Sequence, residues 1–89
     1  MTKYYLQPQQ YDSVKSFYKK ATVIETDDGE TILQSYDTQV CKITADGKFI
    51  RLWDGYSATT MRHINSFLKY IGLPGGGKHW WNDQTIGGF

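Results

Sequence analysis

Few side chains in this sequence could carry out covalent chemistry, and they do not form a recognisable catalytic set. Cys41 is the only thiol, and His63 and His79 are the only histidines that could act as its base. Cys41 falls in a predicted strand, where a free cysteine usually packs as a small apolar side chain. Two histidines 16 residues apart and one cysteine also match no standard metal-ligand spacing. We therefore predict a protein that is not an enzyme and needs no metal or cofactor.

The segment Gly72–Lys78 has the spacing of a phosphate-binding loop up to its lysine. The next residue is His79, whereas such a loop uses Ser or Thr to bind Mg²⁺. A phosphate-binding loop also joins a strand to a following helix, and this segment instead follows a predicted helix. We interpret it as a helix end followed by a linker.

Aromatic and basic residues alternate along one predicted strand. Phe49, Arg51 and Trp53 share one face of it, and Ile50 and Leu52 share the other. If a helix covers the isoleucine and leucine, the first three side chains form an exposed strip that can stack bases and hold phosphates. Binding of single-stranded nucleic acid is therefore the alternative function.

The C-terminal segment, residues 72–89, is rich in glycine and is predicted to be a loop-like tail. It contains Trp80 and Trp81, and two adjacent tryptophans seldom remain in water, so one or both should dock on the domain or on a partner. Docking on the domain would cover the strip of Phe49, Arg51 and Trp53. The net charge of +1 favours that arrangement, because nucleic-acid-binding proteins usually carry a strong basic excess.

Two Asp-Gly pairs, Asp28-Gly29 and Asp46-Gly47, predict tight hairpin turns, since this pair readily adopts positive φ angles. The segments on either side are rich in β-branched and aromatic residues, which favour strands: Ala21–Thr26, Thr31–Tyr36, Val40–Thr44 and Lys48–Trp53. The intervening Tyr36–Thr38 should form a third turn or a bulge. These signals predict a four-stranded antiparallel meander.

The clearest helix spans Ala58–Ile71, with Ser57 as its N-cap and Gly72 as its C-terminal left-handed residue. Apolar residues recur at helical spacing and form a stripe along one side: Met61, Ile64, Phe67, Leu68 and Ile71. The polar residues Arg62, Asn65, Ser66 and Lys69 fall on the other side. The stripe should lie across one face of the sheet. The 89 residues are thus predicted to form a single α+β domain.

Residues 1–15 are predicted to be an N-terminal arm or a short helix over Pro8–Phe17, because Pro8 suits a first helical position. The N-terminus lacks the apolar stretch of a signal peptide, and no apolar run reaches the roughly 18 residues of a membrane span. We therefore expect a cytoplasmic protein that does not enter a membrane.

Charge is unevenly distributed despite the near-zero total. Residues 25–37 contain five acidic groups and no basic one, which makes the first hairpin acidic through Asp27, Asp28 and Glu30. Such a hairpin could steer a partner, although solvated turns are often acidic without a functional reason. An uncovered sheet face bearing Phe49 and Trp53 would also be an apolar patch, which predicts a two-fold homodimer.

Three stretches resemble a family of small uncharacterised proteins, a domain of unknown function found in phages, prophages and mobile elements of Firmicutes and other gut bacteria. They are Ser16–Ile24, Ile32–Val40 and Leu52–Leu68, and the resemblance covers roughly residues 16–70. It implies no established activity. It favours an accessory protein that binds a host or phage protein, for example an inhibitor of a host defence system such as a CRISPR effector. The partner-binding candidates are Phe49, Arg51, Trp53, Tyr56, Arg62, His63, Asn65, Trp80 and Trp81.

Overall fold

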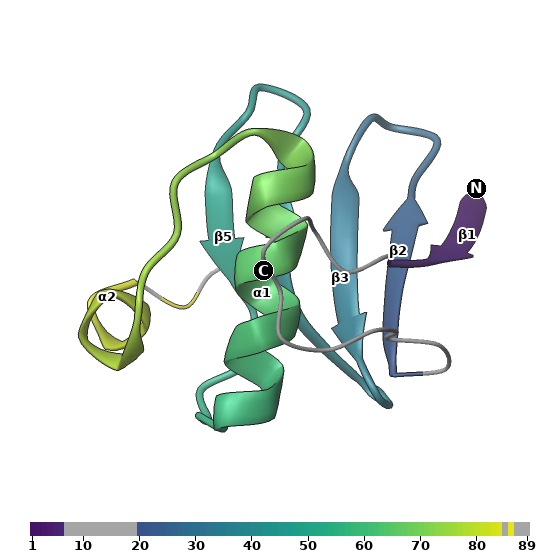
Figure 1. Ribbon diagram of the computed structural model, residues 1–89. Helices are drawn as coiled ribbons and strands as arrows, with labels where there is room; N and C mark the ends of the chain where they lie inside the picture. The colour runs from purple at the N-terminus through teal and green to yellow at the C-terminus, as the bar shows by residue number, and fades with distance from the viewer. Residues whose placement is uncertain (7–19, 85, 87–89) are drawn as a thin grey trace.

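The computed structural model describes residues 1–6, 20–84 and 86 (Figure 1). In chain order the elements are β1 (Thr2–Tyr5), β2 (Ala21–Glu25), β3 (Thr31–Ser35), β4 (Thr38–Ile43), β5 (Phe49–Arg51), α1 (Ala58–Ile71) and α2 (Lys78–Asn82). The strands form one sheet in the order β1-β2-β3-β4-β5, each antiparallel to the next. The predicted α+β class and meander are confirmed, but the sheet has five strands rather than four. The helix predicted over Pro8–Phe17 lies outside the described residues.

The strand that the sequence prediction missed is β1, at one edge of the sheet. Thr2 pairs with Glu25 and Tyr5 with Thr22. Leu6 follows the strand, is buried, and donates its backbone N–H to the carbonyl of Ala21 at 2.9 Å. No hairpin turn signal links this short strand to β2 in the sequence, so its pairing could be found only in the folded chain.

The two Asp-Gly hairpins have the same turn structure. Gly29 and Gly47 have φ angles of 90° and 87°, as the Asp-Gly signal predicts. In each turn a threonine hydroxyl donates to the aspartate two residues later and accepts the backbone N–H of the residue four positions later. In the first turn these residues are Thr26, Asp28 and Glu30. In the second turn they are Thr44, Asp46 and Lys48. Tyr36 and Asp37 form the third turn, which confirms the first of the two forms predicted for this segment. A bulge lies beyond the segment, in β4 between Gln39 and Cys41.

Helix α1 begins and ends where its sequence predicts. Ser57 accepts the backbone N–H of Thr60 at 3.0 Å, and Gly72 has a φ of 97° and donates to the carbonyl of Leu68 at 2.8 Å. The apolar stripe is buried except for Ile71, which is half-buried. Ser66 was predicted on the polar side but is buried as well.

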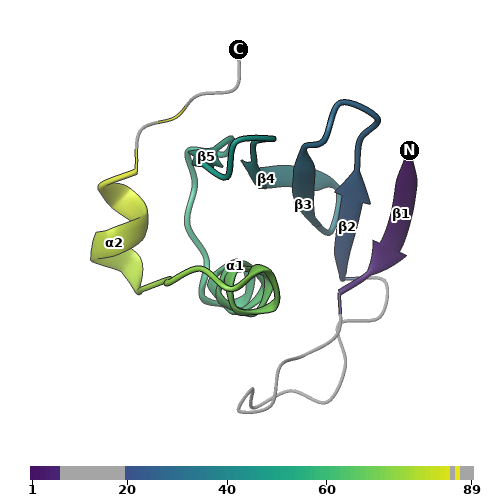
Figure 2. The same ribbon diagram turned by 90° about the horizontal axis from the view of Figure 1, so that it is seen from above.

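Helix α1 covers one face of the sheet, and α2 lies beside the β5 edge (Figure 2). The strand register places Arg51 in line with Cys41 and Leu33, which are both buried on the covered face. The condition for an exposed strip, that α1 covers Ile50 and Leu52, is therefore not met, because strand alternation puts these two on the opposite, open face. No helix in the described part of the chain is long and apolar enough to cross a membrane.

Candidate functional site

Arg51 is held inside the protein and is not on a free surface. It is 6% exposed. Its guanidinium donates to the carbonyls of Trp53 at 2.7 Å and Trp81 at 3.0 Å, and also to that of Gly55 at 3.3 Å. The guanidinium carbon lies 4.3 Å from the centre of the Trp81 ring. Arg51 therefore fastens the C-terminal segment to the sheet, and the exposed strip predicted from the sequence is not present.

The two adjacent tryptophans dock on the domain itself. Trp81 is fully buried and donates its indole N–H to the carbonyl of Gly55 at 2.7 Å. Its ring centre lies 6.4 Å from those of Phe49 and Trp53, and the half-buried Trp80 lies 5.3 Å from Phe49. The tail thus contains helix α2 and covers the patch on which the predicted homodimer rested.

The glycine-rich segment is fixed to α1 through one side chain. The Asn65 amide donates to the carbonyls of Met61 and Gly76 at 3.0 and 2.9 Å, and its oxygen accepts the N–H of Gly76 at 3.0 Å. Asn65 was a candidate for partner binding, but these contacts give it a structural role. Gly72 ends α1 as predicted, but the lysine of the apparent phosphate-binding pattern begins a second helix, α2, in the tail that was predicted to be loop-like.

The acidic hairpin is largely compensated by neighbouring groups. Asp27 forms an ion pair with the N-terminal amine at 2.6 Å, and Glu30 forms one with Lys42 at 2.9 Å. The Thr26 hydroxyl lowers the pKa of Asp28 from its ordinary value. These three carboxylates are therefore accounted for by turn geometry and local pairing. Among the described residues there is no group of His, Cys, Asp and Glu side chains that could hold a metal ion.

A buried polar cluster joins β3 to the first half of α1. The Ser35 hydroxyl lies 2.7 Å from Nδ1 of His63 and 3.2 Å from the Thr60 hydroxyl. All three residues are buried, and His63 is 1% exposed. Burial lowers the pKa of His63, and the positive charge of Lys20 lowers it further. Cys41 is separate from this cluster, and burial alone raises the pKa of its thiol, which keeps the sulfur in its unreactive form.

The buried His63 should make the protein less stable in acid. Because the pKa of His63 is lower in the folded than in the unfolded chain, the unfolded chain binds more protons below the ordinary histidine value of about 6.5. The urea midpoint should therefore fall as the pH is lowered from 7 through 6.5 and below. Replacing His63 by Gln should flatten this dependence, whereas replacing the exposed His79 by Gln should not. Equal pH dependence of the urea midpoint in the two variants would show that His63 is not the source of the acid sensitivity.

Tyr36 lies on the surface above this cluster in a strained backbone conformation. Its φ is 54°, and it is the one non-glycine residue with a positive φ in the part of the chain that the structure describes. Glycine is favoured at the first central position of a two-residue hairpin turn with this geometry. The Tyr36 side chain is nevertheless 51% exposed, with its ring centre 5.7 Å from that of His63. Nothing in the sequence Tyr-Asp signals this conformation.

We define the helix-start surface as five exposed residues in the Tyr36–Asp37 turn and at the beginning of α1: Tyr36, Asp37, Tyr56, Thr59 and Arg62. The turn and the start of α1 lie at the same end of the molecule, opposite the two Asp-Gly hairpins (Figure 1). Lys78 of α2 lies 5.2 Å from the centre of the Tyr56 ring. This surface includes two of the predicted partner-binding residues, Tyr56 and Arg62, whereas His63 lies beneath it.

The fold and these sites define a small α+β domain in which Cys41 and His63 are buried and His79 is exposed. Residues 4–83 match the family of unknown function DUF8033, and the chain belongs to that family. No curated protein and no solved structure matches the chain.

Proposed function

We propose that this protein is not an enzyme and acts by binding another protein through the helix-start surface. The observation that supports this most is Tyr36. A tyrosine at positive φ costs roughly 1–2 kcal/mol relative to glycine, and the ring gains little burial in return. Strain of this kind is commonly retained where a side chain must be presented to a ligand.

The composition of the helix-start surface suits a protein partner. Tyrosine provides a large amphipathic contact area with few rotatable bonds, and arginine is also enriched in interfaces. Tyr36 and Tyr56 are 51% and 42% exposed, and Asp37 and Arg62 supply one charge of each sign. A surface with charges of both signs suits contact with another protein better than contact with a polyanion such as a nucleic acid.

The proposal extends to the biological setting that the sequence resemblance implies. In that setting the protein is an accessory factor of a phage or mobile element, acts in the bacterial cytoplasm, and binds a host protein such as a component of a CRISPR defence system. Nucleic-acid binding through Phe49, Arg51 and Trp53 loses its support, because phosphate contact with Arg51 would require removal of its three carbonyl partners.

Replacing Tyr36 by Gly should separate stability from binding. Glycine relieves the positive φ but loosens the unfolded chain, so the free energy of unfolding should stay equal or rise by up to about 1 kcal/mol. Partner capture should nevertheless be lost. Urea unfolding measures the first effect. Affinity purification from lysate of a bacterial host, with and without nuclease, followed by mass spectrometry measures the second.

The matched control is Tyr70→Ala, because Tyr70 is 48% exposed but lies in the last turn of α1. Wild type and this control should retain the same nuclease-resistant protein in stoichiometric amount, and Tyr36→Gly should not. Recovery of nucleic acid alone, or equal capture by the Tyr36→Gly chain, would exclude the proposal.

A further inference from the structure

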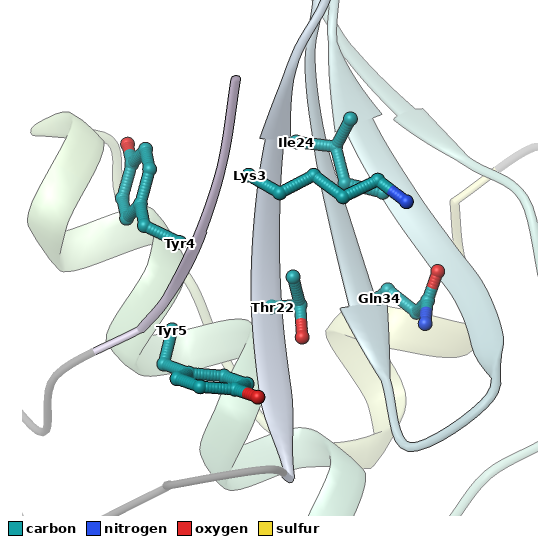
Figure 3. Close-up of a pocket in the computed structure, with 6 residues that line it drawn as sticks. All are labelled: Lys3, Tyr4, Tyr5, Thr22, Ile24 and Gln34. Carbon is teal, nitrogen blue, oxygen red and sulfur yellow. The ribbon is translucent and has the colours of Figure 1, made fainter. Parts of the chain in front are cut away.

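The open face of the sheet, on the side away from α1, contains a hollow of about 380 Å³. This volume falls within the range of small-ligand pockets. The lining residues come from β1, β2 and β3: Lys3, Tyr4, Tyr5, Thr22, Ile24 and Gln34. Figure 3 shows Lys3 reaching across β2 towards β3, Tyr5 lying across the lower part of β2, and Thr22 and Gln34 projecting between them.

Lys3 gives the hollow a positive charge that no described residue pairs with. The sheet register places Lys3, Ile24 and Lys42 in one row across the open face. Lys42 is neutralised by Glu30 at 2.9 Å, but the Lys3 ammonium has no ion pair or hydrogen bond within the described ranges of the chain. An anion bound here would therefore meet one cation that is not already paired.

The remaining lining combines an apolar floor with polar groups. Ile24 is only 4% exposed although it faces the open side, because the side chains around the hollow surround it. Gln34 uses one amide N–H to donate to the carbonyl of Tyr36 at 3.1 Å, which leaves its second N–H as a donor. The Thr22 hydroxyl can also donate, and the Tyr5 ring offers a flat face.

We propose that this hollow binds a small organic anion consisting of one carboxylate attached to a flat apolar group. The carboxylate pairs with the Lys3 ammonium and accepts from Gln34 or Thr22, while the apolar group lies between Ile24 and the Tyr5 ring. A single negative charge is specified because the hollow supplies a single cation, and a second charge removed from water would have no partner. The inference is independent of the protein-binding function and concerns the opposite side of the sheet.

The test is titration of the isotope-labelled full chain with sodium benzoate, followed by ¹H–¹⁵N NMR. We expect saturable shifts centred on the amides of Thr22, Ile24 and Gln34, with a dissociation constant on the order of 1 mM for so small a ligand. Benzamide, which has the same shape without the charge, should bind about tenfold more weakly. Lys3→Met should also weaken benzoate binding about tenfold, because it keeps the stem and removes the ammonium.

Lys48→Met is the matched control, since Lys48 is an exposed lysine on the distant second hairpin. Its affinity for benzoate should equal that of the wild type. Arg62→Met, which alters the proposed protein interface and no residue that lines the hollow, should also bind benzoate normally, which keeps this inference separate from that interface. Equal affinity for benzoate and benzamide, unchanged binding by Lys3→Met, or shifts that never saturate would overturn the inference.

Discussion

Replacement of Arg51 by methionine should lower the free energy of unfolding by about 3 kcal/mol, because it removes the donors to three carbonyls and leaves a shorter apolar side chain in their place. The carbonyl of Trp53 would then lose the donor that Arg51 supplies, and the carbonyls of Gly55 and Trp81 would keep only the N–H groups of the Trp81 indole and of Gln84. The contact of the guanidinium with the Trp81 ring would also be lost. Urea unfolding followed by circular dichroism gives the change in stability, and a red shift of tryptophan emission would report the release of Trp81.

Two further variants distinguish a specific role of Arg51 from a general effect of charge. Arg51→Lys keeps the charge but lacks the planar group that reaches three carbonyls, so it should recover only part of the lost stability. Arg62→Met removes an exposed arginine and should change the free energy of unfolding by less than about 0.5 kcal/mol. If Arg51→Met were as stable as Arg62→Met, the anchoring role would be wrong.

The features that local sequence could predict are those determined by a few neighbouring residues. The turns at Gly29 and Gly47 follow from Asp-Gly chemistry, and the bounds of α1 follow from its caps and apolar stripe. Each signal depends on backbone conformations that only a few side chains favour. Such signals remain readable whatever packs around them.

The features that were missed depend on contacts between distant parts of the chain. The strand that became β5 has two apolar faces, and its own sequence favours neither. The face carrying Arg51 is covered because the backbone near Trp53 and the ring of Trp81 satisfy the guanidinium. Likewise, the pairing of Ser35 with His63 joins residues 28 positions apart, and no local pattern indicates it.

The same distance in sequence explains why the candidate site was only partly predicted. Arg62 was identified on α1 and Tyr56 just before its N-cap, but Tyr36 comes from a turn between two strands. Its position near α1 depends on the Ser35–His63 contact and on the bulge in β4. A positive φ at a tyrosine arises from the geometry of the finished hairpin. For that reason the residue that most supports the proposed function could be found only from the structure.

Trp81→Ala should have the largest effect on stability, a loss of about 4 kcal/mol in the free energy of unfolding. Trp81 is completely buried, and its removal leaves a cavity beside Phe49 and Trp53. It also removes the 2.7 Å hydrogen bond to the Gly55 carbonyl, which keeps only the longer one from Arg51 at 3.3 Å. Arg51 would also lose the ring on which it lies. A small domain has a total stability of only about 5–15 kcal/mol, so this variant should be largely unfolded well below the wild-type melting temperature.

Trp80→Ala is the matched control, because Trp80 is the adjacent residue in α2 but is half-buried and contacts mainly Phe49. It should lose about 1–2 kcal/mol, since a half-exposed ring contributes less buried area. Thermal unfolding of the two variants by circular dichroism gives the comparison. The order of the two losses is the decisive result: if Trp80→Ala were the less stable protein, or if Trp81→Ala melted with the wild type, the tail would not be an integral part of the core.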